Sequence, residues 1–179
     1  MFSNVRLGRR NGEHWTGCKN CADLKTQESS KNGPSSSTVH RKEAEPIMID
    51  GGEDIGSVAV FADGKHVVSS HDQGTVQRWR IEDGKEVGTA MNVGSGVLNI
   101  AVSRDGKLIV GGTVGGLVTV WNAESHSRVT EFKTHHDYVR AVDISPDATK
   151  IVTGSEDKNA CVWSLSTGKR LLGPWEHNH

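Results

Sequence analysis

Apolar and polar positions are distributed very differently in the two parts of the chain. From residue 55 onward, short segments that alternate apolar and polar residues are separated by turn dipeptides, as in "IGSVAVFADGKHVVSSHDQGTVQRWRIEDGK". This pattern predicts β-strands joined by hairpins. Residues 1–50 instead contain polar stretches such as "TQESSKNGPSSSTVHRKEAEP". We expect residues 1–50 to be a disordered polar arm, because they cannot bury enough apolar surface to offset the entropy lost on ordering.

A repeat of constant length underlies the alternating pattern. Trp79, Trp121 and Trp163 stand at equal intervals along the chain. The same interval relates further sets of similar residues: Ile55, Val97 and Val139; Val60, Val102 and Ile144; Asp63, Asp105 and Asp147. Each copy predicts four short strands that form one antiparallel sheet. Within 51–179 we therefore expect three repeats, at about 51–92, 93–134 and 135–176, and the start of a fourth.

The repeats resemble those of the WD40 family, which recur every ~40–45 residues and build the blades of a β-propeller. The third copy carries the most complete motif, "THHDYVRAVDISPDATKIVTGSEDKNACVWSL". The repeat tryptophans are followed by Arg80, Asn122 and Ser164 where the family name has aspartate. The resemblance covers roughly residues 50–179. It implies an all-β fold of about three four-stranded WD40-type blades in an incomplete ring.

The resemblance also implies a structural hydrogen-bond network in each blade. In the family, a histidine before the first strand, a hydroxyl residue on the second, an aspartate in the tight turn and the tryptophan indole bond to one another. The third copy supplies all four residues: His135, Thr153, Asp157 and Trp163. The other copies have different residues at the histidine and aspartate positions: Gly51 and Gln73 in the first, Val93 and Gly115 in the second. We expect those two blades to lack the network and to be less rigid.

The sequence does not favour an enzyme. His135, Ser155 and Asp157 have the residue types of a catalytic triad, but Asp157 is expected in a tight turn and no Gly-x-Ser-x-Gly elbow is present. The glycines of "GGTVGGLVTV" lack the Gly-Lys-Ser/Thr end of a phosphate-binding loop. Cys161 is expected to be a small buried residue on the face of Trp163. We predict no catalytic residue and no cofactor.

The N-terminal arm contains one candidate metal motif, "HWTGCKNC", with Cys18 and Cys21 in a CxxC and His14 upstream. A structural zinc site needs a second pair of ligands at a suitable spacing, and His40 is the one other candidate in the arm. A thioredoxin-like role would need a surrounding βαβ pattern. We therefore predict no metal site and interpret the two cysteines as incidental thiols.

Composition and charge indicate the kind of partner and the location. The chain has 179 residues, a formal net charge of −1 and three cysteines. A charge so close to zero gives no field that favours nucleic acid or an anionic membrane, and the sequence has no run of ~18 apolar residues. An odd number of cysteines in a chain that does not start with an apolar secretory signal favours a reducing compartment. We expect an intracellular, cytoplasmic protein, with the nucleus as the alternative, that binds neither nucleic acid nor membrane.

These features favour a non-enzymatic scaffold that binds other proteins. In the WD40 family, loops on one face of the ring contact partners, and the matching positions in the third copy are Tyr138, Arg140 and Glu156. An aromatic side chain beside an arginine has the chemistry of a binding hot spot. Asp54 and Asp72 match Tyr138 and Glu156 in the first copy. We predict that these five residues contact a protein partner.

The number of repeats raises the question of what completes the ring. Propellers typically have four to eight blades, whereas this sequence encodes three. His177 follows His135 by one full repeat, so "WEHNH" is expected to begin a fourth blade. We expect a fragment or partial propeller of a larger WD40 protein. Two alternatives stay open: a sensor region associated with a signalling enzyme, and an oligomer of partial propellers that associate through open blade edges.

Overall fold

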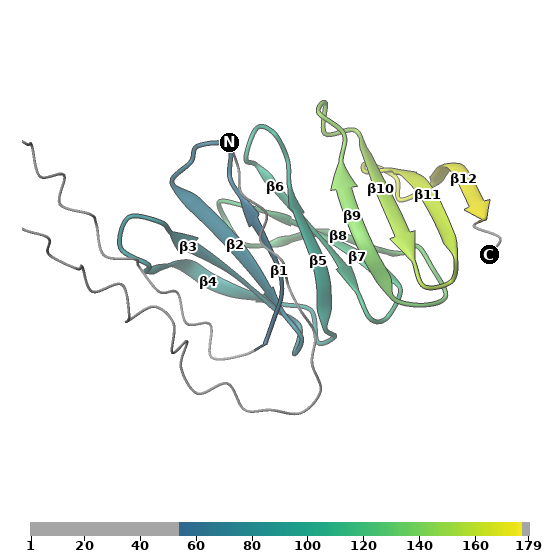
Figure 1. The fold of residues 1–179 in the computed structure, drawn as a ribbon. Helices are drawn as coiled ribbons and strands as arrows, with labels where there is room; N and C mark the ends of the chain where they lie inside the picture. The colour runs from purple at the N-terminus through teal and green to yellow at the C-terminus, as the bar shows by residue number, and fades with distance from the viewer. Residues whose placement is uncertain (1–53, 177–179) are drawn as a thin grey trace, which may run out of the picture. The chain divides into compact units, whose positions relative to one another are not determined.

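The structure, a computed structural model, describes residues 54–176 and is built from β-strands in that range (Figure 1). The predicted disordered arm at 1–50 and its CxxC motif lie outside the described residues. The strands are β1 (Ile55–Val60), β2 (His66–His71), β3 (Thr75–Arg80), β4 (Glu86–Asn92), β5 (Val97–Val102), β6 (Leu108–Thr113), β7 (Leu117–Asn122), β8 (Arg128–Lys133), β9 (Val139–Ile144), β10 (Lys150–Ser155), β11 (Asn159–Ser164) and β12 (Arg170–Glu176). No helix of this range is long and apolar enough to cross a membrane.

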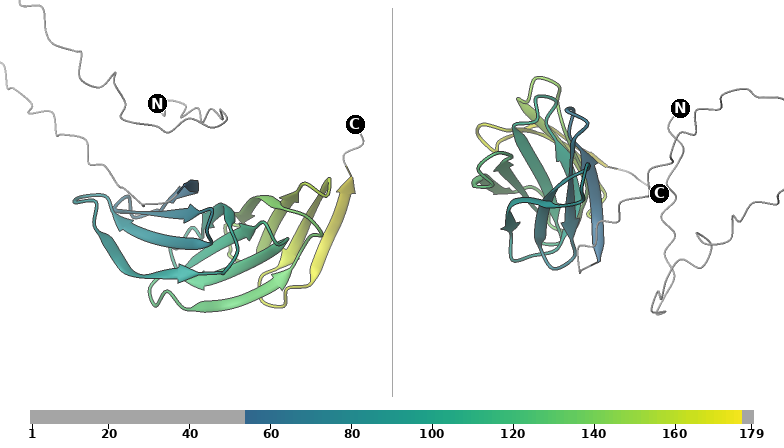
Figure 2. Two further views of the ribbon diagram at one scale, coloured as in Figure 1. Left: turned by 90° about the horizontal axis from the view of Figure 1, so that it is seen from below. Right: turned by 90° about the vertical axis from the view of Figure 1, so that its left-hand side faces the viewer.

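The strands form three four-stranded sheets, which we call the first, second and third blade. In each blade every strand pairs antiparallel with the next one along the chain, in the order β1–β4, β5–β8 and β9–β12. The blades stand side by side, with the inner strands β1, β5 and β9 adjacent (Figures 1 and 2). Residues 54–176 do not close a ring. The predicted all-β fold of three blades in an incomplete ring is confirmed.

The apolar core lies between the blades rather than within any one of them. One cluster joins the first and second blades: Phe61, Val68, Val76, Met91, Val97, Ile100, Ile109, Trp121 and Ala123. A second cluster joins the second and third blades: Ala101, Val110, Val118, Val120, Val139, Val142 and Ile151. Neighbouring residues of β6, such as Ile109 and Val110, enter different clusters because side chains along a strand point alternately to its two faces. The second blade therefore buries both of its faces, one against each neighbour.

Gly112 allows the second and third blades to approach closely. A Cβ atom at this position would lie 2.6 Å from Cγ1 of Val139 and 2.9 Å from Cγ1 of Val142. Both valines belong to β9, and Val139 is completely buried. The glycine thus makes room for the inner strand of the third blade against β6.

An aspartate fixes the first hairpin of each blade. Oδ1 of Asp63, Asp105 and Asp147 accepts a hydrogen bond from the backbone N–H two residues later, at 2.8, 3.1 and 3.1 Å. At Asp147, hydrogen bonds from the Ser145 hydroxyl and from the N–H and hydroxyl of Thr149 lower the carboxyl pKa to about 2. The repeated aspartates are therefore part of the turn geometry and are held in their charged form.

Gly112→Ala is expected to destabilise the domain. The added methyl group would overlap both valines of β9, and overpacking of this kind costs about 1–3 kcal/mol. The midpoint of urea unfolding should fall accordingly. The control is Gly115→Ala, because a Cβ there would meet no atom closer than 3.5 Å. Equal midpoints for the two variants would contradict the role assigned to Gly112.

Acid should destabilise the blades through their turn aspartates. A carboxyl group whose pKa falls on folding contributes stability above its unfolded pKa of about 4. For Asp147 this contribution is lost as the pH falls toward the folded pKa of about 2. Asp147→Asn removes the titration but keeps an acceptor for the Thr149 N–H, so stability measured by urea unfolding should decline less steeply below about pH 4. Parallel curves for variant and native chain would refute this assignment.

Candidate functional site

One edge of each blade is formed by the loop that leads into its inner strand and the turn that follows its second strand. Equivalent backbone hydrogen bonds join the two segments: Asp72 N–H to Asp54 O at 3.1 Å, Val114 N–H to Gly96 O at 3.0 Å, and Glu156 N–H to Tyr138 O at 3.0 Å. Beside each bond the strand pairing skips one residue, which is Gly56, Leu98 or Arg140. Such β-bulges redirect side chains at strand ends. The predicted partner residues therefore occupy equivalent places on the first and third blades.

Tyr138, Arg140 and Glu156 form a contiguous cluster on this edge of the third blade. The guanidinium carbon of Arg140 lies 5.3 Å from the centroid of the Tyr138 ring, within the range of a cation–π contact. The same guanidinium donates hydrogen bonds to Oε1 of Glu156, with Nε at 2.7 Å. Tyr138 is 40% exposed, and the side chains of the ion pair are 39% and 42% exposed. The three side chains hold one another in place and remain accessible.

The corresponding edge of the first blade is acidic. Asp54 and Asp72 are both exposed and are linked by their backbone hydrogen bond. Among the described residues, no hydrogen bond or ion pair connects either aspartate with the Tyr138 cluster. The structure thus places the five predicted partner residues on two separate blades, and only the three of the third blade form one cluster.

A groove of about 530 Å³ lies next to the Tyr138 cluster. Its lining comes from β9, β10, β11 and the turn before β11: Arg140, Ala141, Gly154, Ser155, Glu156, Lys158, Asn159 and Ala160. Gly154 is paired with Ala141 on one side and with Ala160 on the other. Sequence reasoning identified the charged rim but missed the groove. The available signal was this row of three small residues at paired positions across one sheet.

The tryptophan of the third blade belongs to a buried polar network. Nε1 of Trp163 donates to Oγ1 of Thr153 at 2.8 Å, and the same oxygen bonds to Nε2 of His135 at 2.7 Å. Nδ1 of His135 bonds to Oδ2 of Asp157 at 2.9 Å. Thr153 is 1% exposed and His135 is 3% exposed. The structure therefore brings together the four residues that the WD40 resemblance implied.

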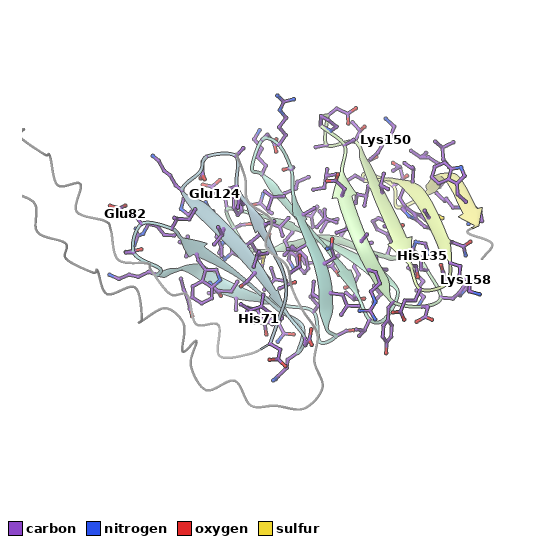
Figure 3. The ribbon with its side chains drawn as sticks, viewed as in Figure 1. His71, Glu82, Glu124, His135, Lys150 and Lys158 are labelled. Carbon is purple, nitrogen blue, oxygen red and sulfur yellow. The ribbon has the colours of Figure 1, made fainter. Side chains whose placement is uncertain are left out.

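Asp157 fastens the loop before β9 to the turn between β10 and β11. Burial opposes its negative charge, but hydrogen bonds outweigh this effect and lower the pKa of the carboxyl group. The donors are the backbone N–H of His136 at 3.1 Å, the ring of His135 and the backbone N–H of Asn159 at 3.0 Å. Figure 3 shows His135 and Lys158 at the same end of the third blade, where this turn lies.

The first blade builds a different network around its tryptophan. Nε1 of Trp79 donates to the Ser69 hydroxyl at 2.8 Å, and that hydroxyl also bonds to Nε2 of His71 at 2.9 Å. His71 lies on β2 and is 2% exposed, whereas His135 precedes β9. The expectation that the first blade lacks a partner network is therefore wrong. His71 lies two residues after Ser69 on the same face of β2, and it takes the place of the histidine that precedes the inner strand in the third blade.

The second blade has glycine where the other two have a hydroxyl residue. A Cβ at Gly111 would lie 3.0 Å from the ring of Trp121, which is 1% exposed. The indole therefore packs directly against the backbone. In the tight turn of this blade, Oγ1 of Thr113 accepts the N–H groups of Gly115 and Leu117, both at 3.2 Å. A hydroxyl group fixes this turn in place of the carboxylate.

The polar residues of the third blade are not arranged for nucleophilic catalysis. His135 uses both ring nitrogens within the network, and the hydroxyl bonded to it belongs to the buried Thr153. Ser155 accepts the backbone N–H of Asp157 at 3.1 Å. Cys161 is a buried free thiol whose pKa is raised by burial, which disfavours the reactive thiolate. Residues 54–176 contain no group of three side chains suited to hold a metal ion.

Thr153→Val should destabilise the third blade, although the two side chains have similar shapes. The change leaves the buried indole N–H of Trp163 and Nε2 of His135 without a partner, and each unsatisfied group costs about 1–3 kcal/mol. Thr153→Ser keeps the hydroxyl and serves as the control. Urea unfolding followed by tryptophan fluorescence should give a lower midpoint for the valine variant than for the serine variant. The reverse order would remove the network as a source of stability.

Comparison with known proteins agrees with this geometry. Residues 126–164 match the family model of the WD domain, G-beta repeat, known as WD40. The solved structure of U3-55K matches with a TM-score of 0.65 and 22% sequence identity, over 69% of this chain and 40% of that one. The crystal structure of the RRP9 WD40 repeats matches with a TM-score of 0.64 and 23% identity, over 69% and 39%. No curated protein matches the chain.

These matches establish the fold, and they cover about two-fifths of the length of each solved structure. The segment that the family model matches contains the tight turn and the tryptophan of the third blade. The fold of the other two blades follows from their strand order and from the structural matches. Residues 126–164 therefore match one WD40 repeat, and residues 54–176 have the fold of three WD40-type blades.

Proposed function

We propose that this WD40 domain is a non-enzymatic module that binds a protein partner through Tyr138, Arg140 and Glu156. The observation that carries the proposal is the cluster itself: an exposed tyrosine, its stacked arginine and the paired glutamate on one blade edge. Tyrosine and arginine are enriched in binding hot spots. Because the arginine is already oriented by the glutamate, little side-chain entropy is lost when a partner binds.

The chemistry of the interior supports a binding role over catalysis. The most polar buried site of the third blade is occupied by its own hydrogen bonds, from Trp163 through Thr153 to His135 and Asp157. We also propose that the protein works inside the cell, which suits the free buried thiol of Cys161. Asp54 and Asp72 are proposed as a secondary, acidic contact on the first blade.

We further propose that the three blades function as part of a larger propeller. Rings of this type typically contain four to eight blades. The solved WD40 structures that match the domain are longer, since the match covers 40% and 39% of their chains. Additional blades would place the partner-binding edge of the third blade on one face of a complete ring.

Replacing Tyr138 and Arg140 together by alanine should weaken partner binding at least about tenfold, as expected for the loss of a hot spot. The full chain would be immobilised, exposed to an extract of the source cells, and its captured proteins identified and titrated. Arg80→Ala is the matched control, because Arg80 is also an exposed arginine in an ion pair, with Asp83 of the first blade. Partners should be lost from the double variant and retained by Arg80→Ala.

The tyrosine content of the chain offers an independent readout of the same surface. Tyr138 is the single tyrosine of the sequence, so nitration of tyrosine reports on this edge alone. A bound partner should slow the nitration of Tyr138. Full reactivity in the presence of a saturating partner, or equal capture by the double variant and the control, would overturn the proposed site.

A further inference from the structure

The chain makes the same contact between blades twice. Val68 on the second strand of the first blade shares a core cluster with Val97 of β5. Val110 on the second strand of the second blade shares a core cluster with Val139 of β9. The sequence repeat relates Val68 to Val110 and Val97 to Val139. One side of the contact is therefore always the second strand of a blade, and the other side is the inner strand of the next.

Among residues 54–176, the third blade presents the second-strand side of this contact with no blade against it. Val152 is the repeat equivalent of Val68 and Val110, which are both 0% exposed, yet Val152 is 45% exposed. Gly154 is the equivalent of Gly112. A Cβ at Gly154 would have one neighbour within 4 Å, the Cβ of Ala141 at 3.7 Å, whereas the space at Gly112 is filled by two valines of β9.

The groove described above occupies this vacant place on the third blade. Its floor contains Ala141, Gly154 and Ala160, and its charged rim is formed by Arg140 and Glu156. Val152 lies on the same face as Gly154, because the two residues are two apart in β10. We call this surface, formed by Ala141, Val152, Gly154 and Ala160, the open face.

Strand β1 presents the opposite side of the contact. Ile55 and Val58 are the repeat equivalents of Val139 and Val142, the two valines that fill the space at Gly112. Val139 and Val142 are 0% and 8% exposed, whereas Ile55 and Val58 are 49% and 63% exposed. We call Ile55, Val58 and the 63%-exposed Val60 the β1 ridge.

We propose that the open face binds the β1 ridge of a second copy of this chain. The two surfaces are the separated halves of a contact that the fold already makes twice, in the same register and with the same residue types. Two copies that exchange both contacts would be related by a two-fold axis and would place six blades in one ring, within the usual range of four to eight. Such a ring would cover both the open face and the β1 ridge.

The two sides of the contact can be tested by separate charge substitutions in the full chain. Val58→Lys and Val152→Lys each place a charge in the proposed interface, where it would be buried without a partner. Both valines are exposed in the single chain, so neither change should reduce its folded content by circular dichroism. Val129→Lys is the control, because Val129 on β8 is 54% exposed and belongs to neither surface.

Sedimentation velocity over a range of concentrations should show the native chain and Val129→Lys at twice the mass of one 19.3 kDa chain. The dimers of Val58→Lys and of Val152→Lys should each dissociate at concentrations at least about tenfold higher than the dimer of the native chain. Mixing these two variants should improve association through one of the two contacts, because the open face of Val58→Lys and the β1 ridge of Val152→Lys are both unchanged. The mixture also separates this contact from a pairing of β1 with β1, which mixing would not restore.

The proposal is overturned if the native chain sediments as a monomer at every concentration. It is also overturned if neither lysine variant weakens association, or if the mixture associates no better than its components. The single variant Tyr138→Ala separates this result from partner binding, because Tyr138 does not line the groove and the change leaves Val58 and Val152 intact.

Discussion

The central physical constraint is that each four-stranded sheet carries apolar side chains on both faces. Such a sheet gains stability in water from each face that a neighbour covers. In the second blade, Trp121 is buried toward the first blade, and Val110 is buried toward the third. The fold is therefore a row of mutually dependent units, and its stability comes mainly from the contacts between blades, as in other repeat architectures.

The dependence of each blade on its neighbours explains why the spacing of the sheets and the geometry of the hairpin turns are held by specific residues. Sheets that must fit face to face tolerate few changes in spacing, since interiors are packed without spare volume. Gly112 keeps the backbone of β6 close to β9, and the turn aspartates hold the hairpin ends in register. The indole hydrogen bonds vary more. Trp163 has a four-membered network, Trp79 a shorter one, and Trp121 packs on glycine.

The regular part of the molecule could be predicted from sequence because it repeats. A constant repeat length fixes strand number, turn positions and the burial of the tryptophans together. The resemblance implied the network of the third blade, but comparison by position missed His71, because that histidine reaches the serine from a different strand position. The groove was missed because a glycine in sequence does not reveal whether the space beside it is filled, as at Gly112, or empty, as at Gly154.

Differences between the blades concentrate where packing does not restrict them. Positions at the centre of the contact between blades keep their type through the repeat, as Val68, Val110 and Val152 do. The blade edges vary freely, from Asp54 on the first blade to Tyr138 on the third. A surface that recognises another protein can differ from blade to blade. A surface that packs against the next blade must keep the same residue types at each repeat. In our two proposals the third blade carries both kinds of surface, and the ion pair of Arg140 and Glu156 lies on the boundary between them.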